Sequence, residues 1–292
     1  MPDLSVIITA YNARPTISDC LRSLENQINF QDFEVIVIDS STDDTAESVR
    51  HHFPWVRLFH FNTRLYCGSA RNIGIREAKA DIIAFIDADC IADPGWASAI
   101  IRSHQKDYAA VGGPIGNADP SSLTSTAAYF GEFSQWMPGN LPGFKKDIAG
   151  ANMSYKKWVF EEFGDFIEGT YSSDTVFHWR LKRAGIRLFF DPGILIYHQY
   201  TRNFSSLLRH EIEHGRSFAE VRMRYGSFGP WTRLLYCVGC FPLFLKMACL
   251  IFLRNVLNPV YLSSFLKVWP LMLFVNGAWV LGEVMGYQNG VE

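Results

Sequence analysis

Three short apolar runs near the N-terminus limit what this chain can fold into. Residues 4–9, 34–39 and 81–87 are rich in β-branched side chains and too short for a helix, so each is expected to form a strand that is buried on both faces. Helical patterns separate them, at residues 16–27 and then at 42–50 and 70–80. This alternation predicts a parallel α/β sheet, whose ligands bind where the strands end.

The pattern is weaker in the middle of the chain. Residues 111–150 are rich in Gly, Pro and aromatic side chains, and we expect loops over a site there. An amphipathic helix is predicted over residues 174–184, ended by Gly185. Two further strands are expected at residues 186–190 and 194–198.

The composition changes in the last third of the chain. Residues 202–233 carry six arginines against three glutamates, a net charge of +3, whereas residues 1–201 carry a net charge of −6. A basic helix beside an apolar run is typical of contact with an anionic membrane, and a solvated helix face is the alternative. We therefore divide the chain into a catalytic domain at residues 1–201 and a membrane-associating region at residues 202–292.

Two apolar runs in that region could contact a bilayer. Residues 234–253 are interrupted only by Pro242 and Lys246 and are long enough to span a core of about 30 Å. Residues 268–286 are a weaker candidate because they contain Glu283. Spanning helices, helices in the membrane interface and a hydrophobic subunit contact all remain open, and flanking positive charges on both sides leave the orientation undecided.

The overall composition excludes several classes of protein. Hydrophobic residues make up 48% of the chain, charged residues 19%, and the formal net charge is −2, which argues against a disordered protein and against a nucleic-acid partner. Six cysteines without repeated spacing fit a reducing, cytoplasmic setting. Cys237 and Cys240 have CxxC spacing but no second pair, so we interpret them as small apolar residues. The β-rich run that follows residue 3 indicates no signal peptide.

The residues that follow the predicted strands carry the candidate chemistry. Asp87, Ala88 and Asp89 end the third strand, and paired carboxylates at this position suit Mg²⁺ or Mn²⁺, although a solvated turn is the alternative. Asp39 ends the second strand, where it could bind part of a nucleoside or cap the next helix. Arg71, near the start of the third helix, could reach a diphosphate or form a surface salt bridge.

Six segments, in order, resemble the motifs of family 2 glycosyltransferases with a GT-A fold. They are SVIITAYN (5–12), VIVIDSSTDDT (35–45), GSARNIG (68–74), ADIIAFIDAD (80–89), GANMSY (150–155) and SDTVFHWRLKRAG (173–185). The resemblance covers about residues 4–200. It implies a Rossmann-like mixed sheet and a metal-dependent, inverting transfer of a sugar from a nucleoside diphosphate sugar, most often a UDP-sugar.

The resemblance also implies roles for single residues. The nucleotide-sugar site would comprise Thr9, Ala10, Tyr11, Asn12, Asp39, Arg71, Asp87 and Ala88, with the nucleobase held by the residues of the first two motifs. Asp174 lies where the family places its general base. Asp89 would bind Mn²⁺ or Mg²⁺, together with His198. The acceptor or the donor sugar would meet Asn152, Ser173 and Trp179.

Three departures from the family pattern qualify these roles. Ser173 stands where an acidic residue usually precedes the base, which bears on acceptor positioning. The usual pair of aspartates after the second strand is reduced to Asp39, which bears on how the base is bound. The QxxRW signature of processive synthases is absent, so we expect one sugar to be transferred at each encounter.

These patterns favour a non-processive glycosyltransferase at the cytoplasmic face of the inner membrane. Its acceptor would be a lipid-linked saccharide or polysaccharide precursor, and a homo-oligomer is left open. A nucleotidyltransferase would be expected to carry a glycine-rich basic loop near the N-terminus, which is lacking. A non-catalytic saccharide-binding scaffold would have little reason to keep both Asp89 and Asp174. A dinucleotide oxidoreductase needs GxGxxG after the first strand, and TAYNAR contains no glycine.

Overall fold

The computed structural model describes residues 1–28, 32–200, 203–226 and 230–289. It divides the chain into two compact units whose segments alternate along the sequence. Unit 1 consists of residues 1–118, 136–169 and 173–199, and unit 2 of residues 119–135, 170–172 and 200–292. The predicted domain boundary at residues 201 and 202, with Arg202, lies outside the described residues, as do the side chains of Arg233 and Cys237.

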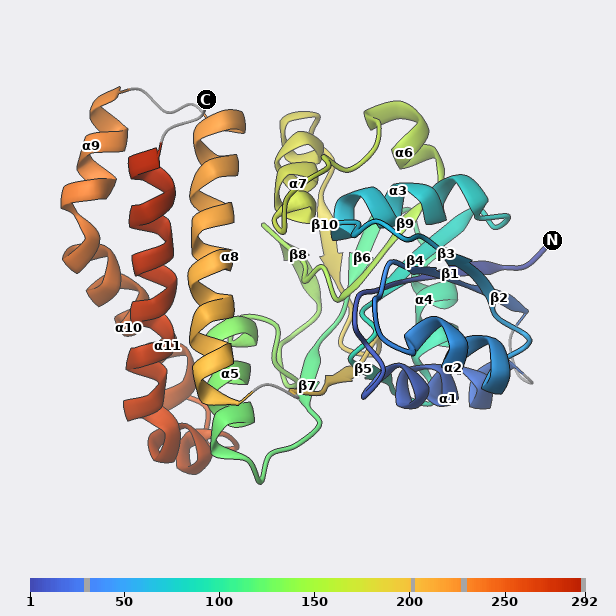
Figure 1. The fold of residues 1–292 in the computed structure, drawn as a ribbon, viewed down its shortest axis with the longest axis horizontal. Helices are drawn as coiled ribbons and strands as arrows, with labels where there is room; N and C mark the ends of the chain where they lie inside the picture. Colours follow the sequence, from blue (N-terminus) through green and yellow to red (C-terminus); the bar gives the residue numbers. More distant parts are fainter. Residues whose placement is uncertain (29–31, 201–202, 227–229, 290–292) are drawn as a thin grey trace. The chain divides into compact units, whose positions relative to one another are not determined.

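Unit 1 is built on an eight-stranded sheet in the order β3-β2-β1-β4-β9-β6-β10-β8 (Figure 1). The first four strands along the chain pair in parallel, as predicted. The second half is mixed, because β9 runs antiparallel to β4 and β6, and β8 runs antiparallel to β10. The strands are β1 Leu4–Ala10, β2 Phe33–Asp39, β3 Arg57–His60, β4 Ile82–Ile86, β6 Ala110–Gly112, β8 Gly143–Lys145, β9 Asn152–Lys156 and β10 Leu188–Phe190.

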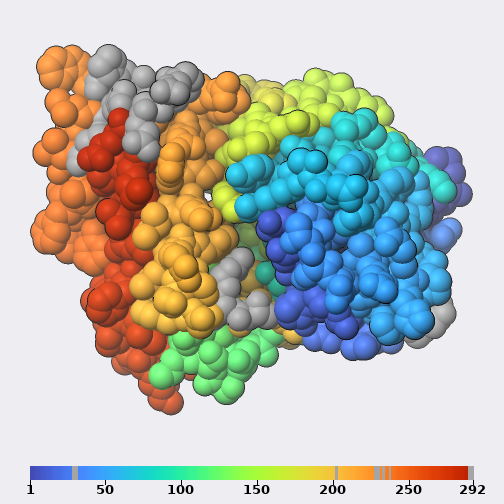
Figure 2. Space-filling model, in the orientation of Figure 1, coloured from blue at the N-terminus to red at the C-terminus, as the bar shows by residue number. Residues whose placement is uncertain are grey.

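Helices cover both faces of this sheet. One face carries α3 (Cys67–Glu77), α6 (Trp158–Phe163) and α7 (Ser173–Arg183), and the other carries α1 (Ile17–Ile28), α2 (Thr45–His52) and α4 (Trp96–His104), as Figure 1 shows. In the space-filling view of Figure 2, the N-terminal segments, blue to cyan, form one continuous surface on the right of the view. The expected α/β fold with a Rossmann-like mixed sheet is therefore confirmed.

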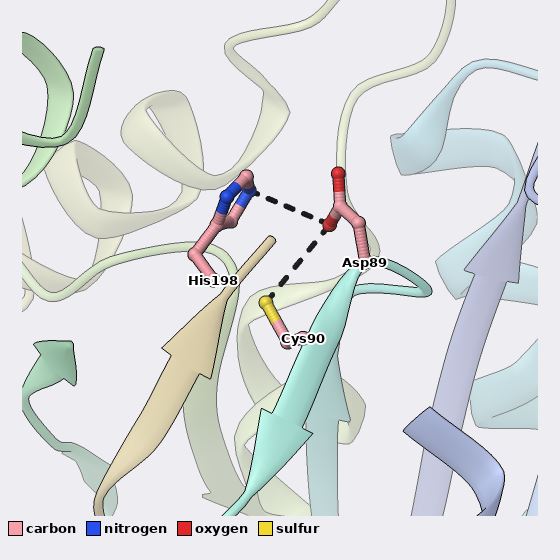
Figure 3. Close-up of side chains that lie close together, drawn as sticks. All are labelled: Asp89, Cys90 and His198. Atoms are coloured by element: carbon pink, nitrogen blue, oxygen red, sulfur yellow. Dashed lines mark hydrogen bonds and ion pairs between the residues drawn. The ribbon is translucent and has the colours of Figure 1, made fainter. Parts of the chain in front are cut away.

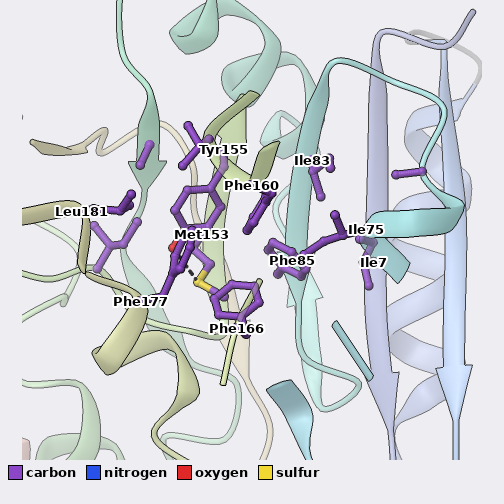
Figure 4. Close-up of a cluster of buried hydrophobic side chains, with 14 of the residues drawn as sticks. Ile7, Ile75, Ile83, Phe85, Met153, Tyr155, Phe160, Phe166, Phe177 and Leu181 are labelled. Atoms are coloured by element: carbon purple, nitrogen blue, oxygen red, sulfur yellow. Dashed lines mark hydrogen bonds between the residues drawn. The ribbon is translucent and has the colours of Figure 1, made fainter. Parts of the chain in front are cut away.

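A cluster of aromatic side chains fills the core between the sheet and α3, α6 and α7 (Figure 4). Tyr155 of β9 contacts Phe160, Phe166 and Phe177, and Phe85 of β4 contacts Tyr155, Phe160 and Phe166. The ring centroids in this cluster are 4.8 to 6.4 Å apart. Each of these rings is at most 5% exposed. Burial of such a side chain contributes about 1.5–3 kcal/mol, so this cluster holds α7 firmly against the strands.

A second, three-stranded sheet in the order β5-β11-β7 extends the end of β4. Its strands are β5 (Cys90–Ala92), β11 (Ile196–His198) and β7 (Ile115–Asn117). Strand β11 runs antiparallel to β5, with His198 opposite Cys90. This pairing brings a residue from late in the chain beside the turn that follows β4.

Unit 2 contains the helices α5 (Leu123–Phe133), α8 (Phe204–Tyr225), α9 (Pro230–Val238), α10 (Cys240–Val256) and α11 (Leu262–Asn289). Helices α8 and α11 approach so closely that a Cβ at Gly215 would lie 2.1 Å from the Trp279 carbonyl oxygen. On α5, Phe130 packs against Phe265 of α11, with centroids 5.2 Å apart. Residues 170–172 join this unit through Ser217 of α8, whose Oγ accepts a hydrogen bond from the Tyr171 amide at 3.2 Å.

The structure corrects two expectations for the elements. Residues 111–150, predicted as loops, contain α5 and three short strands, and α5 belongs to unit 2. Strand β3 was not predicted at all, because its four residues, three of them half-buried, show no apolar run. The expected end of α7 is confirmed, since Gly185 follows it with a φ of 81°, a conformation that favours glycine.

The predicted 20-residue membrane run is also corrected. Residues 234–253 do not form one helix, because α9 ends at Val238 and α10 begins at Cys240. With 17 residues, α10 is about 26 Å long, less than the bilayer core of about 30 Å. Among the described residues, only the helix over Leu262–Gln288 is long and apolar enough to cross a membrane, and 44% of its most apolar stretch is buried in the protein. A core helix of a soluble protein meets the same criterion.

Candidate active site

Two carboxylates lie in the turn between β4 and β5. The Cys90 amide donates a hydrogen bond to the Asp87 carbonyl oxygen at 3.0 Å, and the Asp89 carbonyl oxygen accepts one from the Gln199 amide at 2.8 Å. These bonds fix the backbone on both sides of the buried Ala88. The side chains of Asp87 and Asp89 are 35% and 32% exposed, so a ligand can reach both.

Arg71 connects this turn to the start of α7. Its Nη2 lies 3.4 Å from Asp87 Oδ1 and donates a hydrogen bond to the Gly150 carbonyl oxygen at 3.0 Å. A Cβ added to Gly150 would lie 2.4 Å from Asp174 Oδ2 and 3.4 Å from Arg71 Nη2. Arg71 therefore lies between two predicted site carboxylates: it pairs with Asp87 and approaches Asp174 beside Gly150.

The surroundings raise the pKa of Asp87. Removal from water is the main cause, the negative charge of Asp89 adds to it, and the charge of Arg71 opposes it. Arg71 is only 4% exposed and stays charged at any physiological pH. The turn thus combines two neighbouring carboxylates with one buried cation, an arrangement suited to holding a metal ion and an anionic group side by side.

Asp89, Cys90 and His198 form a group of three metal-ligating side chains (Figure 3). Their donor atoms all lie within 4.8 Å of one another. His198 Nε2 is 3.4 Å from Asp89 Oδ1, and Cys90 Sγ is 3.9 Å from the same oxygen. One carboxylate, one imidazole and one thiol around a common point fit a divalent cation.

The ends of β1 and β2 are joined by side chains. Asn12 has a φ of 52°, a left-handed conformation that asparagine tolerates, and its Oδ1 accepts a hydrogen bond from the Thr42 amide at 2.9 Å. Its own amide donates to Ser41 Oγ at 2.7 Å. Ala10, the last residue of β1, pairs with Asp39, and the half-buried Thr9 precedes it.

Asp39 is fully buried and already has two partners. Ser41 donates to its Oδ1, and His60 Nδ1 lies 2.6 Å from its Oδ2. Nearby, the ring of Tyr11 is 41% exposed and has the Arg64 guanidinium 4.4 Å from its centroid. The structure thus brings the predicted nucleotide residues to one edge of the sheet. It adds His60, which ends strand β3, and Arg64, which follows it; both were missed with that strand.

The three predicted acceptor or sugar residues have different surroundings. Asn152 is fully buried, and its amide group bonds to Trp96 Nε1 and to two backbone carbonyl oxygens at 2.7 to 3.0 Å, so it serves the fold. Ser173 is fully buried against Gly68 at the start of α7. Trp179 follows Asp174 by five residues, which places it about 140° away around the helix.

A buried network next to the site was also missed. His178 is 1% exposed, its Nδ1 pairs with the Asp147 carboxylate, and its Nε2 lies 2.6 Å from the Tyr155 hydroxyl. Because His178 follows Asp174 by four residues, it lies on the same side of α7. The network fixes α7 to β9 and to the loop that leads to Gly150. In the sequence, only the four-residue spacing between Asp174 and His178 could have indicated this network.

Comparison with known proteins places this site in a family. The family described as "Glycosyl transferase family 2" matches residues 5–162. The chain is 26% identical over 234 residues to Glycosyltransferase AglE of Haloferax volcanii, covering 76% of this chain and 75% of that relative. Four other curated relatives are matched over only 24% to 34% of their own length.

Two solved structures share the fold. A mannosyltransferase from Pyrobaculum calidifontis, in complex with GDP-Man and Mn²⁺, has a TM-score of 0.59 at 18% identity and covers 94% of this chain and 86% of its own. S. aureus TarS 1-349, in complex with UDP-GlcNAc, has a TM-score of 0.57 at 17% identity, with coverages of 94% and 90%. Since the family match spans more than half of the chain and its motifs are the ones that meet at the carboxyl end of β4, this chain belongs to glycosyltransferase family 2 and is a glycosyltransferase.

Proposed function

We propose that this protein transfers one sugar from a nucleoside diphosphate sugar to an acceptor hydroxyl, with inversion at the anomeric carbon. The observation that carries the proposal is the approach of Arg71 and Asp174 at Gly150, with Arg71 also 3.4 Å from Asp87 and with Asp89 of the same turn paired to His198. An inverting displacement needs a base on one face of the sugar and charge neutralisation at the departing diphosphate on the other. These side chains supply both.

The donor would lie along the carboxyl ends of β1, β2 and β4. We propose that the nucleobase binds at Tyr11 and the turn joined by Asn12, and that Arg71 binds a diphosphate oxygen. Asp89 and His198 would hold Mn²⁺ or Mg²⁺. When bound, the cation would neutralise negative charge on the leaving diphosphate.

Asp174 would act as the general base. It is the second residue of α7, where the helix dipole favours the ionised carboxylate and thus lowers its basicity somewhat. Arg71, which also lies against Gly150, keeps the carboxylate in place by charge attraction. The acceptor hydroxyl would give its proton to Asp174 Oδ2 as its oxygen attacks the anomeric carbon, and the sugar–phosphate bond breaks on the opposite face.

We propose a UDP-sugar as the donor and a lipid-linked saccharide or polysaccharide precursor as the acceptor. The lipid-linked acceptor is supported by unit 2, where the apolar side chains of α9 and α10 are exposed: Trp231, Leu234, Leu235, Val238, Phe241, Leu245, Leu250 and Leu253. Between Glu220 and Glu283 the chain has no acidic residue and six Lys or Arg. An apolar surface with only positive charges suits the anionic cytoplasmic face of the inner membrane.

Nucleotide release from a panel of UDP-, GDP- and dTDP-sugars tests the donor and the metal together. We expect turnover of one donor with Mn²⁺ or Mg²⁺, none with EDTA, and a loss of at least about a hundredfold in Asp174→Asn, as for removal of a general base. Asp191→Asn, in the turn after β10, is the matched control and should keep its activity. Full activity of Asp174→Asn would refute the role of the base.

The acceptor and the stereochemistry need their own measurement. Proton NMR of the first product should show an anomeric configuration opposite to that of the donor, and retention would refute the inverting mechanism. With a lipid-linked saccharide and the corresponding free saccharide compared at equal concentration, we expect transfer to favour the lipid-linked form. Equal rates would refute the lipid-linked acceptor.

A further inference from the structure

We propose that Cys90 is a third protein ligand in the metal site formed with Asp89 and His198, and that the site therefore binds thiophilic ions such as Zn²⁺ and Cd²⁺ more tightly than Mn²⁺. This inference rests on the metal site of the proposed function. It adds a ligand that sequence reasoning missed, and the thiolate strengthens the preference for thiophilic ions beyond what Asp89 and His198 produce.

The pairing of β5 with β11 places Cys90 beside His198. In the antiparallel register, His198 lies directly opposite Cys90, so the two side chains lie on the same face of the three-stranded sheet. Cys90 is fully buried and His198 is 6% exposed. Figure 3 shows the thiol of Cys90 and the imidazole of His198 both directed at the carboxylate of Asp89.

The three donor atoms are close enough for one cation, and hydrogen bonds hold the backbone that carries them. The three donor atoms lie within 4.8 Å of one another, a separation that one cation can bridge with a small adjustment of side chains. The Cys90 amide is bonded to the Asp87 carbonyl oxygen and the Gln199 amide to the Asp89 carbonyl oxygen, so the backbone on both strands is fixed. Within the described part of the chain, this is the one group of three such ligands.

Cys20 shows what a buried cysteine without a ligand role looks like. Cys20 is also fully buried. Its thiol donates a hydrogen bond to the carbonyl oxygen of Asp87 at 3.6 Å, and Asp87 precedes Asp89 of the metal group by two residues. Cys20 lies on α1, outside the group of three ligands. The two cysteines share the burial and differ in the presence of an imidazole and a carboxylate around the sulfur.

The donor set decides the metal preference. The group offers one sulfur, one nitrogen and one carboxylate oxygen, and catalytic zinc sites likewise use three protein ligands drawn from Cys, His and carboxylates. Thiolate ligands select Zn²⁺ over the harder Mn²⁺ and Mg²⁺, in line with the general order of stability of their complexes. On binding, the S–metal bond forms as the thiol of Cys90 loses its proton to solvent.

Titration of the metal-free full-length protein with Cd²⁺ tests the proposal, because a Cd–thiolate bond gives a charge-transfer band in the ultraviolet. We expect a saturable band in the natural protein and in Cys20→Ser, and its loss in Cys90→Ser. Calorimetry should show Zn²⁺ affinity at least about tenfold weaker in Cys90→Ser, since even outer-shell changes cost that much. Mn²⁺ affinity, followed by electron paramagnetic resonance, should change by less than about threefold, because Asp89 and His198 remain.

The outcomes separate this inference from the proposed function. A band that persists unchanged in Cys90→Ser, or that is absent from the natural protein while Mn²⁺ still binds, overturns the role of Cys90 and leaves the Asp89–His198 site standing. Failure of both Cd²⁺ and Mn²⁺ to bind overturns the metal site itself. Circular dichroism of each variant identifies any that has failed to fold, and Cys90→Ala then replaces Cys90→Ser.

Discussion

Gly150 is the residue at which the charged groups of the site meet. A methyl group there would come within 2.4 Å of Asp174 Oδ2, a distance that forces the carboxylate to move. The φ of Gly150 lies outside the left-handed region, so its backbone conformation does not require glycine. Glycine is needed at this position because a side chain would collide with Asp174. The close approach of the proposed base and Arg71 thus depends on a single missing Cβ.

We expect Gly150→Ala to lower kcat by about a hundredfold, because displacement of a catalytic group by about 1 Å costs that much. The free energy of unfolding should change far less, since the clash involves a side-chain end that can move aside. Steady-state kinetics and urea denaturation measure the two effects. Gly95→Ala is the control, since its nearest neighbour would be 3.8 Å away. Unchanged kcat in Gly150→Ala would show that Asp174 is not positioned by this contact.

His104 makes the stability of unit 1 depend on pH. It is 4% exposed, Nε2 lies 2.9 Å from Ser154 Oγ, and burial lowers its pKa to about 4 from 6.5. As the pH falls below 6.5, the unfolded chain binds a proton at His104 before the folded chain does. The free energy of unfolding therefore falls between pH 6.5 and pH 4, by up to about 3 kcal/mol from this residue.

Denaturant unfolding of His104→Gln at a series of pH values between 7 and 4 tests this sign. The variant should lose less stability on acidification than the natural protein, whatever its stability at pH 7. His51→Gln changes an exposed histidine, so its free energy of unfolding should fall with pH as much as that of the natural protein. Parallel curves for all three proteins would argue against a neutral, buried His104.

At the scale of elements, the sequence predicted the helices and strands whose apolar residues recur with a clear helical or strand pattern. Apolar runs at residues 35–38 and 82–86 form most of β2 and β4, and they place Asp39 and Asp87 directly after them. Cys90 and His178 could not be assigned, because their partners depend on the register of β11 and on a loop before Gly150. Neither a strand register nor a loop path follows from local periodicity.

The same limit explains α5 and the apolar run at residues 234–253. Length and hydropathy allowed a single spanning helix there, whereas the chain divides at Gly239 into two shorter helices. A Cβ at Gly239 would lie 2.5 Å from the Leu235 carbonyl oxygen, so the break needs glycine. Tertiary packing decided both cases, and apolar composition alone did not distinguish a packed helix from a membrane span.

Helices α8 and α11 are joined along a line of glycines, which gives a prediction at this scale. A Cβ at Gly282 would lie 2.1 Å from the Ile212 carbonyl oxygen. We expect Gly282→Ala to lower the free energy of unfolding of unit 2 by about 1–3 kcal/mol, as overpacking does. Gly277→Ala on the same helix is the control, with its nearest neighbour 3.9 Å away, and urea denaturation measures both. Equal stabilities would show that the helices separate without cost.

At the scale of the whole molecule, the exposed apolar surface of α9 and α10 predicts attachment in the plane of a membrane. Leu235 and Phe241 are 72% and 66% exposed. We expect Leu235→Glu with Phe241→Glu to weaken binding to phosphatidylglycerol-containing vesicles by at least about tenfold, because two apolar side chains lose their burial and negative charges meet anionic headgroups. Vesicle co-sedimentation measures this, with Leu123→Glu on α5 as the control. Undiminished binding would refute attachment through this surface.

The alternating course of the chain means that the catalytic unit cannot be obtained by shortening the protein. Unit 2 includes residues 119–135 and 170–172, both of which lie between segments of unit 1. Removal of everything after residue 200 would leave Phe130 without Phe265, and would leave Tyr171 without Ser217 three residues before the proposed base. Gain, loss or exchange of either unit during evolution would therefore have required the chain to be cut and rejoined at several positions at once. We expect the two units to be inherited together.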